Sequence, residues 1–565
     1  MRSLIAFWVI CALFSNTFAQ PPRGNGRGAG FLRPAPPRSS FFTLQSGPIS
    51  DINPECAAQT VRGLTGRCTS ALDPNLGEAR RPQFSYLDVN SVNFADDGLR
   101  SPREISNIVS DQSGNTLNSR RLNELFVFFG QFIDHDFASS PITDEEEPIE
   151  VPSDDPDLGV STLGFERSLR SRISADSTIE RPITVLSSAL DLSTVYGVDL
   201  ERNDFLRVPN SCRMKTSSGN NLPFNSGGFT NAPSSSRNFY IAGDTRVNEH
   251  PVLTTMHTIF LREHNRLCEL IEGALPNMAA NDMYEAARAI NIAQYQKIIY
   301  EEWLPAILGR KLPRYTGYKP EVDPTISLEF TTAGFRLGHT MVGNGVSRID
   351  ANGRRLPLIT MEQMFFRSSN LQEGDIENFI RGAAGTRAQE VDALVVDALR
   401  NFLFRNVPEE GGIDLISLNL QRGRDHNVPR FNELRRFFLG SSARSFQEIS
   451  RDRTVQRKLQ DAYGSVDNVE AWPGLMAEDK SGAAGIGRTN AELWKREFTR
   501  LRNGDRFFYL DNARHNQIPQ NVLRALPEVD REIFSSQTMF SAILQRTTSI
   551  PRSRLSSGVN IFRAS

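Results

Sequence analysis

The segment 128–137 holds the side chains best suited to chemistry. Gln131, Asp134 and His135 are spaced i, i+3 and i+4, so on a helix they share one face, and Asp136 lies about 100° further round. A histidine that exchanges protons near neutral pH would then face one way and a carboxylate the other. A solvated helix end would show the same residues. A metal-dependent hydrolase could also use a His–Asp pair, but it normally needs further histidines at ligand spacing, which are scarce here.

A second segment places Arg246 and Glu249 at i and i+3, ahead of a long apolar pattern that also carries His257 and His264. Taken alone, an Arg–Glu pair at this spacing is usually a surface ion pair that adds little stability.

A third segment places Arg336 about one helical turn before His339. Gly338 removes side-chain bulk beside the imidazole, which would let a flat cofactor approach. An isolated histidine is more often a satisfied core residue than a ligand. Further along, Asn419 and Arg422 stand in a basic segment that, on its own, is typical of a solvated turn.

Oxygen-bearing side chains gather in the segment 186–197. The side chains of Ser187, Asp191 and Ser193, with the backbone carbonyl of Ala189, offer hard oxygen ligands, and Asp136 would add a carboxylate. Calcium takes roughly six to eight such oxygens. A serine-rich turn capped by Asp191 is the simpler interpretation of the loop alone.

The elements that must position these residues are helical in pattern. Apolar residues recur at three- and four-residue spacing over 122–133 and 253–270. A similar pattern runs from 283 to 304, and Pro305 is expected to end it. Alternating strand patterns are scarce, and no obvious linker divides the chain after about residue 51. We therefore expect a mainly α fold, one large helical domain with little β structure.

The amino terminus predicts export. Arg2 precedes an apolar run from Leu4 to Phe14, followed by small residues that suit cleavage before Gln20, which is the pattern of a secretory signal peptide over residues 1–19. The run is too short to span a bilayer. Residues 20–50 are rich in Pro, Gly and Arg and are interpreted as a flexible leader. The protein is expected to be secreted and extracellular.

Charge and cysteine content agree with that location. The formal net charge is -2, so neither nucleic acid nor an anionic membrane is implied as a partner. Of the five cysteines, Cys11 leaves with the signal peptide and an even number remains. Cys56 and Cys68 flank a turn and form a reasonable local disulfide; Cys212 with Cys268 is the weaker possibility.

Taken in order, these segments resemble the animal haem peroxidase family, which includes myeloperoxidase, lactoperoxidase and peroxinectins. The resemblance runs from about Cys56 to about Tyr509, and it also covers the segments 65–68, 303–309, 472–475 and 501–507. Each motif is weak alone, but the ordered set is specific. It implies a haem peroxidase domain over residues 51–565 that contains haem b and Ca²⁺.

The resemblance also implies individual roles. His135 would exchange protons with hydrogen peroxide, Arg246 would stabilise the charge that develops as the O–O bond breaks, and Gln131 would bond distal water or a halide. His339 would ligate the iron, with Asn419 accepting its second ring N–H. The remaining predicted residues fall into three groups: Arg336 and Arg422 near the haem carboxylates or proximal side, Asp134 and Glu249 as ester links to the haem, and Asp136, Ser187, Ala189, Asp191 and Ser193 as calcium ligands.

Two positions depart from the family pattern. His250 stands where myeloperoxidase has a methionine that forms a third haem link, which argues against chloride as a substrate. Ser187 replaces the more usual threonine of the calcium loop and keeps the hydroxyl. The substrates expected are phenols, including protein tyrosines, and halides or thiocyanate. Two other classes of protein fit part of the pattern: a haem-free adhesion scaffold and a fatty-acid oxygenase of the cyclooxygenase type.

Overall fold

The computed structural model describes residues 52–564 except 96–97, 113, 369–370, 372–373, 404–412, 512–516, 552–554 and 556–559. The predicted signal peptide (1–19) and leader (20–50) lie outside the described residues. Among the described helices, none is both long enough and apolar enough to cross a membrane.

Helices dominate the described chain, as the sequence pattern predicts. They are α2 (Pro54–Ala58), α3 (Pro102–Val109), α4 (Glu124–Phe137), α5 (Ser193–Tyr196), α6 (Leu200–Leu206), α7 (Pro251–Ala274), α8 (Ala280–Ile298), α9 (Leu304–Leu308), α10 (Gly338–Met341), α11 (Met361–Met364), α12 (Asp375–Gly385), α13 (Asp397–Arg400), α14 (Leu415–Asp425), α15 (Phe431–Leu439), α16 (Arg453–Tyr463), α17 (Ala471–Ala477), α18 (Arg488–Asn503), α20 (Gln520–Ala525), α21 (Pro527–Phe534) and α22 (Met539–Thr547).

Strands are short and antiparallel. β1 (Arg81–Pro82), β7 (Glu180–Thr184) and β6 (Arg170–Arg172) form a three-stranded sheet in that order, and three two-stranded sheets pair β2 (Ile142–Glu146) with β5 (Glu166–Ser168), β3 (Ile149–Glu150) with β4 (Thr162–Leu163), and β8 (Gly345–Val346) with β9 (Ile359–Thr360). The predicted fold class, mainly α with little β structure, is confirmed.

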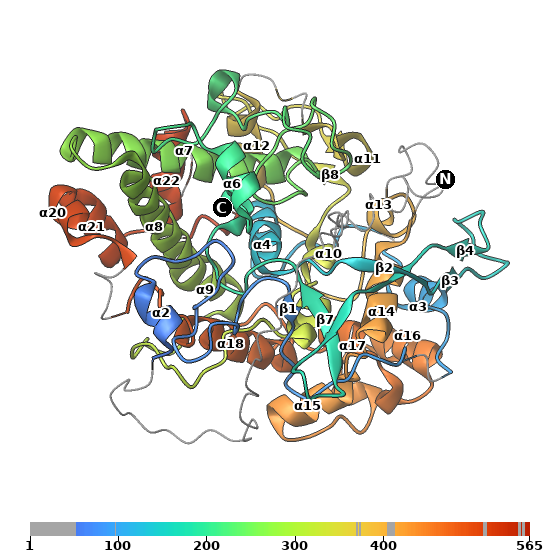
Figure 1. Cartoon of the computed structure of the whole chain (residues 1–565). Helices are drawn as coiled ribbons and strands as arrows, with labels where there is room; N and C mark the ends of the chain where they lie inside the picture. The colour runs from blue at the N-terminus through green and yellow to red at the C-terminus, as the bar shows by residue number, and fades with distance from the viewer. Residues whose placement is uncertain are drawn as a thin grey trace.

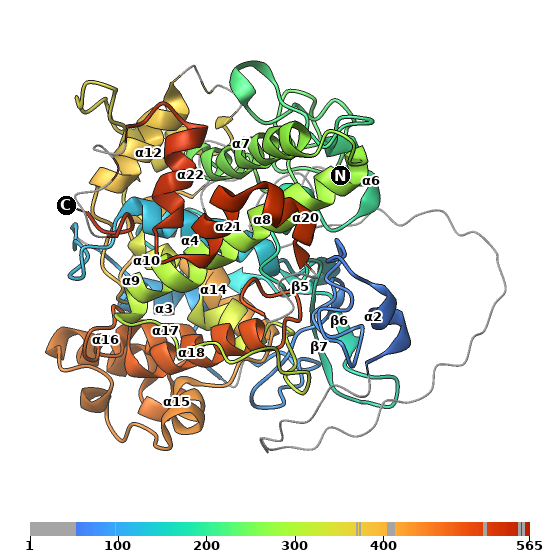
Figure 2. The same ribbon diagram turned by 90° about the vertical axis from the view of Figure 1, so that its left-hand side faces the viewer.

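Helix α4 lies at the centre of the molecule. In both ribbon views it runs between an upper group that includes α7 and α12 and a lower group formed by α15, α16, α17 and α18 (Figures 1 and 2). Asn123 caps its amino end by accepting a hydrogen bond from the Phe126 N–H, and most of its side chains are buried. Its carboxyl end carries both His135 and Asp136, so the core fixes the orientation of the predicted chemical residues.

The expected stop at Pro305 is wrong. After α8 the chain continues through a π-helical turn, Ile299–Trp303, into α9, and the helical path ends at Gly309, which has a positive φ of 71°. Proline is tolerated because it occupies the first turn of α9, where its missing N–H is not needed. The wider turn places Trp303 against Gly130 of α4, where an added Cβ would meet the indole at 3.0 Å.

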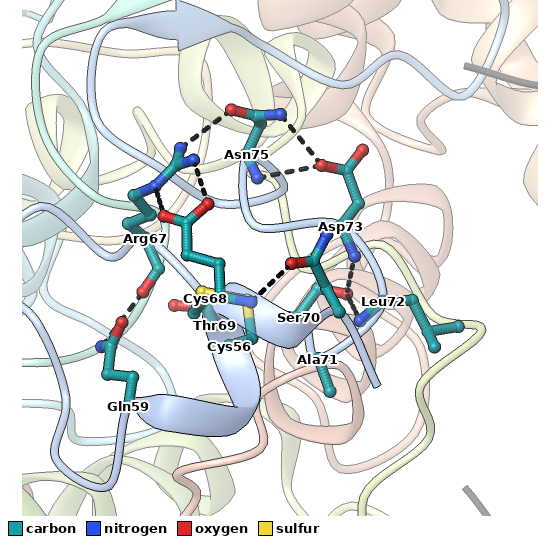
Figure 3. The surroundings of a disulfide bond; sticks show 12 residues. Cys56, Gln59, Arg67, Cys68, Thr69, Ser70, Ala71, Leu72, Asp73 and Asn75 are labelled. Carbon is teal, nitrogen blue, oxygen red and sulfur yellow. Dashed lines mark hydrogen bonds and ion pairs between the residues drawn. A yellow bond between two sulfur atoms is a disulfide. The ribbon is translucent and has the colours of Figure 1, made fainter. Parts of the chain in front are cut away.

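Both predicted disulfides are present, Cys56–Cys68 and Cys212–Cys268. Around the first, Arg67 forms an ion pair with Glu55 and donates to Asn75, whose backbone and side-chain nitrogens both contact Asp73 (Figure 3). The second joins the segment after α6 to α7, so it ties a loop to the helix that begins beside the candidate site.

Candidate active site

A cavity lies along α4. His135 from α4 and His339 from α10 both line it, with Gln131, Asp134, Glu249, His250 and Arg336. Most of the other lining side chains are apolar, and they include Trp303, Phe335, Met341, Met361, Phe365 and Trp494. An apolar wall with a few converging polar groups suits a bound organic molecule.

His135 is almost fully buried, at 2% exposure. Its Nε2 lies 3.8 Å from Glu249 Oε2 and its Nδ1 lies 3.7 Å from Asp244 Oδ1. Burial, followed by the nearby Arg246 cation, holds the pKa of His135 well below its usual value. The imidazole is therefore neutral at physiological pH and can accept a proton.

Arg246 is held by Asp244. The guanidinium donates to both carboxylate oxygens of Asp244, at 2.9 and 2.8 Å, and to the carbonyl of Ala138 at 3.0 Å. Burial opposes ionisation of Asp244, but Arg246 outweighs it and lowers the pKa of that carboxyl below its ordinary range. Among the described residues, Arg246 is not part of the cavity lining. The positive charge of Arg246 therefore acts on His135 from outside the cavity lining.

Gln131 is fixed between two neighbours. Its Nε2 donates to Glu249 Oε1 at 3.0 Å, and its Oε1 lies 2.6 Å from Nε2 of His250. His250 Nδ1 accepts from the Leu253 N–H at the start of α7, which leaves the ring proton on Nε2 to donate to Gln131. Burial raises the pKa of Glu249 to about 8.

Asp134 joins the main cavity to a smaller, polar one. The smaller cavity is lined by Asp134, Arg336, Arg422 and His426, among others. Arg422 lies over the Phe165 ring and donates to Asp425 Oδ2 at 2.7 Å. Burial raises the pKa of Asp134 to about 6. Two arginines therefore line the smaller cavity, and one of them, Arg336, also lines the main cavity.

His339 is held from behind by Asn419 of α14. The Asn419 Nδ2 lies 2.8 Å from His339 Nδ1, while Arg336 donates to Asn419 Oδ1 at 2.8 Å. The predicted contact is present. The predicted direction, with the amide oxygen accepting the ring N–H, differs from the orientation seen here, because Oδ1 of Asn419 accepts from Arg336 and Nδ2 faces the ring. Gly338 beside the ring has open space where a Cβ would stand, so nothing obstructs a flat group there.

The five predicted calcium ligands converge. Ser193 Oγ lies 2.7 Å from Asp136 Oδ1, and Ser187 Oγ lies 2.9 Å from Asp191 Oδ2 and 3.5 Å from the Ala189 carbonyl. All are buried. Burial, together with the Asp191 carboxylate, raises the pKa of Asp136 to about 8, and burial raises the pKa of Asp191 to about 6. Two buried carboxyl groups beside neutral oxygens fit a divalent cation.

Comparison with known sequences decides the family. A family model described as animal haem peroxidase matches residues 61–533. The chain belongs to the animal haem peroxidase family.

Relatives within this family cover most of the chain. Peroxinectin A of Dictyostelium discoideum is 32% identical over 90% of this chain and 97% of its own length. Human eosinophil peroxidase is 32% identical over 84% of this chain and 74% of its own, and human myeloperoxidase is 30% identical over 84% and 72%. This chain is therefore a peroxidase-family enzyme.

Solved structures agree. Peroxidase A from Dictyostelium discoideum matches with a TM-score of 0.80 and 30% identity over 90% of this chain and 100% of that one. The fatty acid alpha-dioxygenase of Oryza sativa matches with a TM-score of 0.75 over 90% of this chain and 87% of that one, at 17% identity. The second match shows a shared fold only.

Animal haem peroxidases use haem, and the cavity of this chain fits it. Imidazoles from α4 and α10 line one space, the His339 ring is hydrogen-bonded at Nδ1, and the residue beside it is a glycine. Sequence reasoning missed two contributors: Asp244, which holds Arg246, and His250 as the partner of Gln131. The Asp-x-Arg spacing was a usable signal for the first, because side chains at i and i+2 in a turn can meet.

Proposed function

We propose that this animal haem peroxidase is secreted and reduces hydrogen peroxide to water at a haem b bound between His135 and His339. The observation that carries the proposal is that both imidazoles, which stand far apart in the sequence, line one cavity with Asp134 and Glu249. When bound, haem supplies an iron that takes peroxide and stores its oxidising equivalents.

His135 acts as the proton carrier. Its low pKa keeps the ring neutral, so it takes a proton from hydrogen peroxide and then delivers it to the departing oxygen. Arg246 stabilises the negative charge that develops during cleavage. Arg246 is paired with both carboxylate oxygens of Asp244, so we infer that its positive charge acts on the reacting oxygens from a distance. It also donates to the backbone carbonyl of His135 at 3.5 Å. Gln131 positions distal water or a halide.

His339 is the iron ligand, and Asn419 fixes the plane of its ring. Arg336 and Arg422 bind the haem carboxylates, which would lie in the smaller, polar cavity that both arginines line. Asp134 and Glu249 form ester links to the haem. Support for this comes from their position on the cavity wall, where Glu249 is buried and Asp134 is half-buried. The raised pKa values of both groups agree with a site that disfavours free carboxylates.

A calcium ion binds Asp136, Ser187, Ala189 (through its carbonyl), Asp191 and Ser193. Because Asp136 adjoins His135 on α4, the ion also fixes the distal helix. The reducing substrates are phenols, protein tyrosines, or halides and thiocyanate. Both disulfides are consistent with an extracellular location.

One preparation tests these statements. The secreted protein is purified, extracted with acidified acetone, and both fractions are examined for a Soret band alongside peroxide-dependent oxidation of guaiacol and iodide. Pigment that stays with the polypeptide, together with turnover, is expected. A colourless, inert protein would indicate a haem-free scaffold, and peroxide-independent oxygenation of fatty acids would indicate an oxygenase.

A further inference from the structure

A continuous series of aromatic rings leads away from the cavity wall. Trp494 lines the cavity and lies 5.8 Å, centroid to centroid, from Phe498. Phe498 lies 6.1 Å from Tyr300, and Tyr300 lies 5.2 Å from Phe508. Phe508 in turn lies 4.9 Å from Tyr315. Neighbouring rings are therefore within van der Waals range all along the series.

The inner rings of the series are buried, and the ring at its outer end is accessible to solvent. Trp494, Phe498 and Phe508 are exposed by 1%, 0% and 2%, whereas Tyr315 is partly exposed. A second indole reinforces the inner end, because Trp303, which also lines the cavity, stacks on Trp494 at 5.5 Å. Figure 2 shows α9, which follows Trp303, close to α18, the helix that carries Trp494 and Phe498.

Tyr315 has a built-in proton acceptor. Its hydroxyl donates to Asp511 Oδ1 at 3.3 Å. Arg502 stands 5.5 Å from the ring centroid, and a cation there disfavours a positively charged ring, so oxidation must be accompanied by loss of the proton. Burial and the Asp511 carboxylate hold the pKa of Tyr315 above its usual value, which keeps the phenol protonated until it is oxidised.

Other tyrosines along the series are less suitable end points. The Tyr300 hydroxyl donates to the Phe498 carbonyl, which is a poor base. Tyr509 reaches the Glu301 carboxylate at 3.3 Å but is only 2% exposed. Tyr315 combines a carboxylate partner, ring contact with the series and access to solvent.

We propose that Tyr315 is a second oxidation site, at which tyrosine side chains of macromolecular substrates too large for the cavity are oxidised through the Trp494–Tyr315 ring series. This rests on the proposed function, since the oxidising equivalents come from the peroxide-treated haem. An electron passes from Tyr315 through the series to the oxidised cofactor, and its phenolic proton passes to Asp511. The Tyr315 phenoxyl radical then takes one electron from a substrate tyrosine and recovers its proton from Asp511, while the phenolic proton of the substrate is released to solvent. The substrate leaves as a radical and couples with another to form dityrosine.

The test compares a bulky and a small reductant with the holoenzyme. Serum albumin, followed by dityrosine fluorescence, reports oxidation of protein tyrosine, and iodide reports chemistry inside the cavity. Tyr315→Phe is expected to slow dityrosine formation several-fold and to leave iodide oxidation unchanged. Phe508→Leu, which keeps Tyr315 but interrupts the series, should slow dityrosine formation in the same way. If Tyr315 served only as a docking contact for the substrate, Phe508→Leu would leave dityrosine formation unchanged. A nitroso spin trap with peptide mass spectrometry should place an adduct on Tyr315.

Tyr318→Phe is the matched control, because Tyr318 stands in the same loop but uses its hydroxyl to accept from the Ala71 N–H. Normal dityrosine yield in both Tyr315→Phe and Phe508→Leu, or no protein-tyrosine oxidation by the wild type despite iodide turnover, overturns this inference alone. Absence of any peroxide-dependent turnover by the wild type overturns the proposed function, and this inference with it.

Discussion

His135 is the residue on which the proposed chemistry depends most directly. Its buried imidazole is kept neutral by burial and by Arg246, so it is ready to accept the peroxide proton. Replacement by glutamine keeps a polar side chain but removes the base, and the rate of reaction with peroxide should fall by about 10²–10⁴-fold. Stopped-flow measurement of the Soret change after mixing with peroxide checks this.

Haem content must be measured in the same His135→Gln preparation, because a loss of cofactor would imitate a loss of catalysis. Glu201→Gln, on the exposed side of α6, serves as the surface control. An unchanged peroxide rate at full haem occupancy would remove His135 from the role of proton carrier.

Glu249 offers a separate test of the covalent attachment. Its Oε1 accepts from Gln131, and glutamine at position 249 would retain much of the side chain's shape but cannot form an ester. Digests of Glu249→Gln should contain haem attached to the Asp134 peptide only, whereas wild-type digests should carry links to both peptides. Mass spectrometry of haem-absorbing peptides distinguishes the two. Identical haem peptides from both proteins would mean that Glu249 forms no link.

At the residue scale, sequence reasoning found the polar groups that line the cavity and only some of the groups that hold them. His135, Gln131 and Asp134 share a helix face, and that relation follows from spacing alone. The contact between His339 and Asn419 joins positions 80 residues apart, and it was predicted from family resemblance, not from spacing. The hydrogen bond between His250 and Gln131 depends on the packing of the start of α7 against α4. A local sequence pattern does not predict that packing.

The loop between β7 and α5 connects the proposed calcium site to α4. Asp136 at the end of α4 accepts hydrogen bonds from the Asp191 and Leu192 N–H groups, so disorder in this loop would reach His135. Removal of calcium by a chelator should lower both thermal stability and peroxidase turnover. A ligand present at 100 times its Kd contributes about 2.7 kcal/mol to the free energy of unfolding.

Asp191→Asn is the matching variant for the calcium loop. It should reduce the calcium content measured by plasma mass spectrometry and make activity depend on added calcium, whereas Asp176→Asn, on an exposed turn, should do neither. Full activity and unchanged melting after complete chelation would contradict the coupling.

The positions of the long helices were predictable from the sequence, but the continuation of the helical path past Pro305 was not. The apolar spacing over 122–133 and 253–270 corresponds to α4 and α7, because both helices bury a continuous face. The predicted stop at Pro305 is wrong, since a proline in the first turn of a new helix loses no hydrogen bond. The π turn Ile299–Trp303 precedes that new helix, and Trp303 lies against Gly130 of α4, a tertiary contact that the local sequence pattern does not predict.

At the scale of the whole molecule, the amino-terminal disulfide segment is bound to the region after α18. Arg62 contacts both carboxylate oxygens of Asp505, at 2.9 and 2.7 Å, across a sequence separation of 443 residues, and both side chains are 3% exposed. Removing one partner of a buried pair strands the other charge, which typically costs about 3–5 kcal/mol. Asp505→Asn should therefore destabilise the protein by roughly that amount, measured by urea unfolding under saturating calcium.

The double variant Arg62→Met/Asp505→Leu separates the pair's own contribution from the cost of an unpaired charge. Replacing both partners by apolar groups should restore most of the lost stability, because desolvation of the ions is no longer required. Glu269→Gln, which breaks an exposed pair with Arg213 (58% and 39% exposed), should cost less than about 1 kcal/mol. A loss of stability in Asp505→Asn as small as that of Glu269→Gln would contradict this prediction. The amino-terminal segment would then be held by other contacts, such as the hydrogen bonds from Arg506 to the Cys68 and Gln59 carbonyls.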